Sequence, residues 1–140
     1  MFEIADDYLA AASHIETALS SVPGVFNVAH LNNLTELDNI TRAPALFYLY
    51  YGDHIDETVM AGNNQKFRQT WLVIVVDRMG ERAQSGKLIA NTIRALAGKR
   101  TGPVGPWKRV NTPIKPKYDK SHGYYPLAFT TEMRIKGAKP

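Results

Sequence analysis

The residues of this chain that could most readily bind a metal ion are His54 and Glu57, three positions apart with Asp56 between them. Imidazole nitrogens and carboxylate oxygens at this spacing can reach one ion. A metal site needs further ligands, and no second cluster of histidines and carboxylates accompanies this one. A solvated turn is therefore the better interpretation. The other histidines lack the serine and acid that accompany a general base: His14, His30 and His122.

Two glycine-bearing segments, 80–86 and 102–106, do not match the spacing of a phosphate-binding loop. Pro103 and Pro106 favour ordinary loop geometry in the second segment. The chain has no cysteine, which excludes a disulfide, a thiolate nucleophile and a cysteine-ligated metal within it. The sequence therefore predicts a protein that is not an enzyme, without catalytic, metal-binding or cofactor-binding residues and without a cofactor.

The remaining chemical signal is a basic segment from Lys99 to Lys120 that includes Trp107 and Tyr118. Lysines and arginines contact phosphates, and aromatic rings can stack on bases. The aromatics are sparse and no recognised nucleic-acid motif is present, so the segment would suit an acidic protein surface equally well. A small basic nucleic-acid-binding module is an alternative at this stage.

The charges are distributed unevenly along the chain. Residues 1–60 carry nine acidic side chains and one basic one, a net charge of −8, whereas residues 61–140 carry sixteen basic and four acidic ones, a net charge of +12. A domain with an acidic and a basic pole can bind copies of itself head to tail, in a contact that closes into a ring or continues as a filament. The alternative is that folding interleaves the two halves and removes the poles.

Length and composition predict one globular domain over residues 1–140. The chain is 44% hydrophobic and 21% charged, and one domain is usual at this length. The N-terminus lacks the pattern of a signal peptide. The longest apolar run, Trp71 to Val76, is far too short to span a membrane. We therefore expect no membrane partner, and a protein that works where it is made or in a particle assembled there.

Two amphipathic helices are predicted, at 4–22 and 81–97. Their apolar stripes are formed by Tyr8, Ala12, Ile15 and Leu19 in the first helix and by Ile89, Ile93 and Leu96 in the second. Pro23-Gly24 ends the first helix, and Gly98 is expected to end the second. Apolar stripes of this kind pack against a sheet, so both helices are expected on one sheet face.

Three strong strands are predicted at 45–51, 67–76 and 127–135, and shorter ones at 25–30 and 107–110. The segment 31–43 is expected to be a loop with at most one helical turn, and 52–65 a hairpin excursion around Thr58 to Met60. From Trp71 onward the second strong strand is apolar on both faces, which requires a cover on each side. A neighbouring subunit is the natural cover for the second face, and the alternative is a layer formed by the chain's own loops.

The segment 98–123 is predicted to be a long loop that is mobile in the free protein and becomes ordered on a partner. It contains four prolines and seven basic residues against one acid. Prolines limit regular hydrogen bonding, and like charges repel. We expect Trp107 or Ile114 to pin this loop to the domain. The tail, 136–140, is expected to be frayed.

Four pieces of the sequence give the chain a layout that resembles the tail terminator proteins, also called minor tail proteins, of long-tailed phages and prophages: ALFYLYY, FRQTWLVIVV, GKLIANTIRALAG and YYPLAFTTEMRI. The resemblance extends from about Ile4 to Ile135 and rests on the order of elements, since the family has no short catalytic signature. It implies an α+β domain, with a mixed or mostly antiparallel sheet, two helices packed on one face and a hairpin excursion. It also implies a six-membered ring that caps the tail tube, ends its polymerisation and joins the head connector.

On this interpretation the partners are copies of the chain itself, the tail tube protein and the head–tail connector protein, with DNA in the ring lumen as a further candidate. The protein would occupy the bacterial host cytoplasm during assembly and the virion tail afterwards. Another head–tail joining protein is the nearest alternative. The residues predicted to meet a neighbouring subunit or a partner are Trp71, Lys99, Arg100, Trp107, Lys108, Arg109, Lys115, Lys117, Asp53, Asp56 and Glu57.

Overall fold

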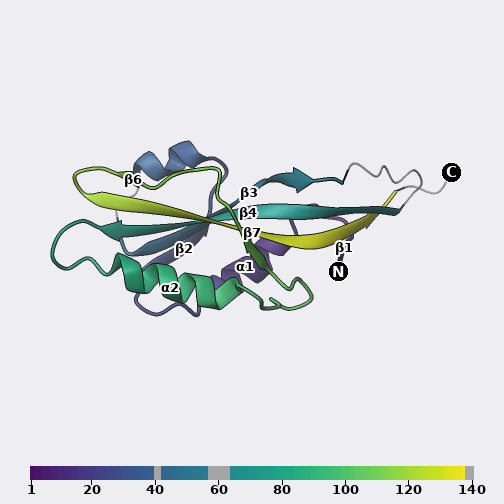
Figure 1. Cartoon of the computed structure of the whole chain (residues 1–140), viewed down its shortest axis with the longest axis horizontal. Helices are drawn as coiled ribbons and strands as arrows, with labels where there is room; N and C mark the ends of the chain where they lie inside the picture. The colour runs from purple at the N-terminus through teal and green to yellow at the C-terminus, as the bar shows by residue number, and fades with distance from the viewer. Residues whose placement is uncertain (40–41, 57–63, 138–140) are drawn as a thin grey trace.

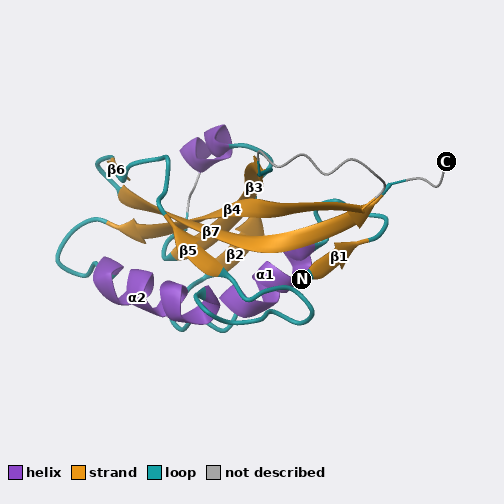
Figure 2. Cartoon of the chain, turned by 45° about the vertical axis from the view of Figure 1, so that its right-hand side comes forward, coloured by secondary structure: helices purple, strands orange, loops and turns teal. Residues whose placement is uncertain are grey.

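The computed structural model describes residues 1–39, 42–56 and 64–137 as a mixed β-sheet flanked by helices (Figure 1 and Figure 2). Its elements in chain order are β1 (Phe2–Ile4), α1 (Ala11–Leu19), β2 (Asn27–His30), the 3-10 helix η1 (Leu34–Asn39), β3 (Ala45–His54), β4 (Asn64–Arg78), α2 (Ser85–Leu96), β5 (Lys108–Val110), β6 (Lys117–Tyr118) and β7 (His122–Lys136). The predicted α+β class is confirmed.

The sheet has the strand order β1-β7-β4-β3-β2. Its central strands β3, β4 and β7 are antiparallel, whereas β1 and β2 run parallel to their neighbours. All three strong predicted strands are confirmed, and each is longer than predicted. Because β3 and β4 pair from Ala45 and Val76 out to His54 and Arg68, the predicted excursion is the outer part of this hairpin. Thr58 to Met60 lie outside the described residues.

The outer parts of β3, β4 and β7 form an arm, which we define as residues 50–56, 64–70 and 130–136. Figure 1 shows these strands extending beyond α2, toward the end of the molecule that carries β1. The pairing of β3 with β4 shifts by one residue between Tyr50 and Gly52. Gly52 has a φ of 148°, and the extra residue, Tyr51, is exposed. Such a bulge bends the strand and re-aims the side chains that follow it.

The first helix is shorter than predicted. It begins at Ala11, and Ile4 lies instead in β1, where it pairs with Ile135 of β7. The start is set locally, because the carboxylate of Asp7 accepts a hydrogen bond from the Leu9 N–H at 2.9 Å and forms a turn ahead of the helix. The buried stripe of α1 consists of Ala11, Ile15 and Leu19.

The second helix also begins late and is rotated relative to the prediction. Leu88, Thr92 and Leu96 are buried, whereas Ile89 and Ile93 are only partly buried. Thr92 tolerates burial because its hydroxyl donates to the Leu88 carbonyl within the same helix at 2.7 Å. Gly98 follows the helix with a φ of 73°, as its predicted role as a helix end requires.

Both helices pack on one sheet face, as predicted (Figure 1). The main core lies between them and the inward side chains of the central strands, which include Leu46, Val73 and Phe129. A second core covers the opposite face, where Phe47, Leu72 and Ile74 are buried. This second core is covered by side chains of the same chain: Leu37 from η1, Val110 from β5 and Ile114 from the segment that follows β5. A neighbouring subunit is therefore not needed to bury this face, and the alternative of a layer formed by the chain's own loops is confirmed.

The outer edge of β7 is paired with three short strands in succession. β6 pairs with residues 123–124, β5 with residues 128–130 and β1 with residues 133–135. Between the last two, the Thr131 hydroxyl donates to the Pro106 carbonyl at 3.1 Å. The N-terminal strand β1 and the segment 106–118, which precedes β7 in the sequence, therefore share the edge of one strand.

Candidate assembly interface

The predicted loop at 98–123 is pinned to the domain by Trp107. This side chain is 1% exposed, and its indole N–H donates to the hydroxyl of Thr101 at 2.9 Å. Its backbone N–H donates to the Lys99 carbonyl at 3.0 Å, and its carbonyl accepts from the Gly98 N–H at 2.7 Å. Trp107 was one of the two residues predicted to act as the pin, and that prediction is confirmed. That the segment becomes ordered only on a partner stays a prediction.

The six cations of this segment that were predicted to meet a partner are all exposed: Lys99, Arg100, Lys108, Arg109, Lys115 and Lys117. Lys117 forms an ion pair with Asp38, with 3.9 Å between Nζ and Oδ1. The other five have no ion-pair partner among residues 1–39, 42–56 and 64–137. Exposed charges contribute little to the stability of the fold. These cations are thus available to an acidic surface on another molecule.

The acidic residues predicted to face them lie on the arm. Asp53 and Asp56 are both exposed, and Glu57 lies outside the described residues. Asp56 is 3.5 Å from a guanidinium nitrogen of Arg68 and 3.3 Å from Nε2 of His54. Strands from the acidic and basic halves of the sequence run side by side in the arm, so the charges there are mixed. The basic segment, in contrast, carries seven positive side chains and one negative one.

Two tyrosines stand around Asp53. The Tyr8 hydroxyl donates to Oδ2 of Asp53 at 2.5 Å. Burial, and then the hydrogen bond to Asp53, raises the pKa of Tyr8, and the same two causes raise the pKa of Tyr50 to about 12. Both phenols therefore keep their protons at neutral pH and can donate to the carboxylate. The hydrogen bond between Tyr8 and Asp53 therefore connects the turn before α1 to the arm.

The two tryptophans predicted at the interface are buried. Trp71 is 0% exposed, and its indole N–H donates to Oε1 of Gln69 at 2.8 Å, while Nε2 of Gln69 donates to the Tyr8 carbonyl at 3.1 Å. Trp71 and Trp107 both belong to the main core, so neither side chain reaches the surface. Gln69 was missed as an anchor. Side chains alternate between the two faces along β4, and this alternation puts Gln69 on the same face as Trp71. That pattern is the signal by which the sequence could have identified it.

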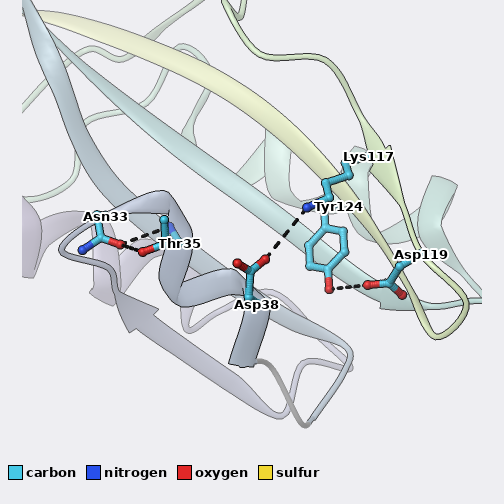
Figure 3. A network of polar contacts seen from close by, with 6 residues as sticks. All are labelled: Asn33, Thr35, Asp38, Lys117, Asp119 and Tyr124. Atoms are coloured by element: carbon cyan, nitrogen blue, oxygen red, sulfur yellow. Dashed lines mark hydrogen bonds and ion pairs between the residues drawn. The ribbon is translucent and has the colours of Figure 1, made fainter.

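An apolar groove lies on the sheet face opposite the helices, between η1 and the segment 114–117. It has a volume of about 150 Å³ and is lined by Leu34, Leu37, Asp38, Ile74, Ile114, Lys115, Lys117, Tyr124 and Pro126. We call it the η1 groove. Figure 3 shows the Lys117–Asp38 ion pair crossing from β6 to η1, with Tyr124 beside it. At the start of η1, the side chain of Asn33 accepts hydrogen bonds from the backbone N–H and the hydroxyl of Thr35.

The turn that follows β6 is held by Asp119. Its carboxylate accepts from the backbone N–H groups of His122 and Ser121, each at 2.7 Å. It also accepts from the Tyr124 hydroxyl at 2.9 Å (Figure 3). These hydrogen bonds lower the pKa of Asp119, the one from His122 most of all. Burial, and then the contact with Asp119, raises the pKa of Tyr124 to about 12. The carboxylate of Asp119 thus binds groups of its own turn, and this turn follows β6, whose Lys117 lines the groove.

The described residues contain no group of three or more histidines, aspartates and glutamates that could hold a metal ion. His30 stacks on Tyr48 with 5.1 Å between ring centroids, and His54 lies beside Asp56 on the arm. None of the helices in the described part of the chain is both long and apolar enough to cross a membrane. The surfaces described above can bind charged and apolar groups of another protein.

Comparison with known proteins bears on this arrangement. The family model described as "Phage tail terminator protein" matches residues 4–139. A search of curated proteins gives no match. Among solved structures, the chain is similar to the PVC sheath/tube terminator of an extracellular contractile injection system in its extended state, determined by cryo-EM, with a TM-score of 0.66 and 9% identity. The similarity covers 97% of this chain and 58% of that one, so the chain spans little more than half of its length. At this identity the likeness concerns the fold.

Proposed function

The chain belongs to the phage tail terminator family, a family of structural tail proteins, and from that premise we propose that it caps a tail tube as a closed ring of identical subunits. The ring ends the polymerisation of the tube and offers its other side to the head connector. We propose six subunits, with DNA passing through the lumen. Assembly takes place in the bacterial host cytoplasm, and the protein remains in the virion tail.

The observation that carries the ring is the set of five unpaired cations on a backbone held by Trp107. Lys99, Arg100, Lys108 and Arg109 flank the buried indole on both sides, and none has an ion pair within the described residues. Within the described residues this surface has no acidic complement, and its backbone is already ordered for one on another molecule. Because the acidic side chains Asp53 and Asp56 lie on a different patch, a contact between copies is heterologous and can close into a ring.

Tube assembly with the matching tail tube protein tests the proposal. Tubes are polymerised with and without this protein and measured by negative-stain electron microscopy. Native mass spectrometry at low and moderate salt gives the number of subunits. We expect tubes that stop lengthening and carry a ring of density at one end. Tubes of unchanged length, or a two-fold dimer that adds no further copies, would contradict the proposal.

A further inference from the structure

Ile55 is the most exposed of the large apolar side chains that the structure describes, at 68%. It follows β3 directly, on the arm, and acidic side chains flank it in the sequence at Asp53 and Asp56. A large aliphatic side chain held in water is unfavourable in proportion to the apolar surface that could be buried. Ile55 is therefore an exposed apolar knob between His54 and Asp56, with Asp53 two residues before it.

The η1 groove has the complementary character. Its lining is mostly apolar, and its charged members are Lys115, Lys117 and Asp38. The Lys117–Asp38 ion pair across it is long, at 3.9 Å, and its side chains are 70% and 69% exposed. Exposed pairs of this kind contribute little, so the pair can open at small cost. A cavity of about 150 Å³ suits one aliphatic side chain rather than a whole strand.

We propose that Ile55 of one copy inserts into the η1 groove of the next copy, with Asp53 and Asp56 facing Lys115 and Lys117. Ile55 does not line the groove of its own chain, whose walls come from η1, β4, β7 and the segment 114–117. The knob and the groove are different patches of one surface, so the same contact repeats from copy to copy around a ring. The inference rests on the proposed function, and it names the contact that joins the subunits.

Disulfide cross-linking tests the contact directly, because the chain has no cysteine of its own. The variant that carries both Ile55→Cys and Leu34→Cys is assembled on tail tubes and oxidised mildly. A disulfide needs Cα atoms about 4.4–6.8 Å apart, so it forms only where the two positions meet. The matched control combines Ile55→Cys with Arg94→Cys, since Arg94 is exposed on α2 and the helix lies on the opposite sheet face.

We expect the first variant to give a ladder of cross-linked species up to the full ring on a denaturing gel, and the control to give none. Separately, Ile55→Ala should raise the concentration needed for capping about tenfold or more. Met79→Ala, at another exposed apolar residue, should leave it unchanged. Thermal melting checks that every variant folds.

Capped tubes without an Ile55–Leu34 cross-link would overturn this contact and leave the proposed function standing. Equal cross-linking in the control would overturn it as well, since that would be random collision. Tubes that are neither capped nor ringed by the unmodified protein would overturn the proposed function itself.

Discussion

Reversing the charges of Lys108 and Arg109 should separate assembly from folding. Both side chains are exposed on β5, and neither has an ion pair within the described part of the chain. The strand is held through its backbone pairing with residues 128–130 of β7, which does not depend on these charges. We therefore expect the double variant Lys108→Glu, Arg109→Glu to change the free energy of unfolding by about 0.5 kcal/mol or less. The corresponding shift in melting temperature is a few degrees.

The effect on capping should be much larger. The two reversals bring the formal net charge of the chain from +4 to zero and place carboxylates where an acidic neighbour is expected. Like charges that meet across an interface cost several kcal/mol, so we expect capping at low salt to weaken by more than about tenfold. The loss should shrink as salt rises, because exposed charges are screened over roughly 10 Å at 0.1 M. The assay is tube length against protein concentration at two salt concentrations.

The matched control is the double variant Lys87→Glu, Arg94→Glu. Both of these cations are exposed on α2, and the change in net charge is the same. If capping falls equally in the two double variants, overall charge decides the outcome and the position of Lys108 and Arg109 does not. If capping is normal in the Lys108 and Arg109 variant, the basic segment is a passive connection and our reasoning on the interface is refuted.

Three further predictions concern the fold. Leu96→Ala should lower the free energy of unfolding by about 2–5 kcal/mol in urea titrations, and Ile93→Ala by clearly less, because Leu96 is fully buried and Ile93 is not; equal losses would contradict the rotation of α2. Asp77→Ala should cost about 2 kcal/mol or more in the same assay, since the buried carboxylate accepts hydrogen bonds from the Gln84 N–H and the Ser85 hydroxyl at the start of α2; Asp77→Asn should cost less. The free energy of unfolding should stay constant up to about pH 10 and decline between pH 10 and 12. The folded-state pKa values of Tyr50 and Tyr124 are raised to about 12, so the unfolded chain loses these protons first. Unfolding curves at pH 9, 10 and 11 measure this, and a flat profile would contradict it.

The central strands could be predicted from the sequence because their pattern is physical and local. Leu127, Phe129 and Met133 recur every second or fourth residue, and in the structure all three face the helices. The helix starts could not be predicted in the same way. They are set by single carboxylates, Asp7 before α1 and Asp77 before α2, whose hydrogen bonds to the backbone leave no mark on hydropathy.

In the candidate site, too, some features could be predicted from local sequence patterns and others could not. That lysines and arginines such as Lys108 are exposed could be expected, because isolated cations are seldom buried; that they meet a partner stays a prediction. The contact between Tyr8 and Asp53 joins residues 45 positions apart, so no local pattern could reveal it. Trp107 lies in a segment rich in proline and lysine, and only the folded chain shows that Thr101 satisfies its indole while the core surrounds it.

The short strands along β7 have a consequence for how the protein behaves at high concentration. An unpaired edge as long as β7, which spans 15 residues, would be a template on which strands of other molecules could add without limit. β6, β5 and β1 divide that edge into segments of two or three paired residues. The opposite border of the sheet consists of β2, of only four residues, and of the outer part of β3, residues 49–54, where the bulge at Tyr51 interrupts the strand edge. Concentrated protein should therefore resist fibril formation, and association between copies is left to side chains, whose number and position limit how many molecules can join.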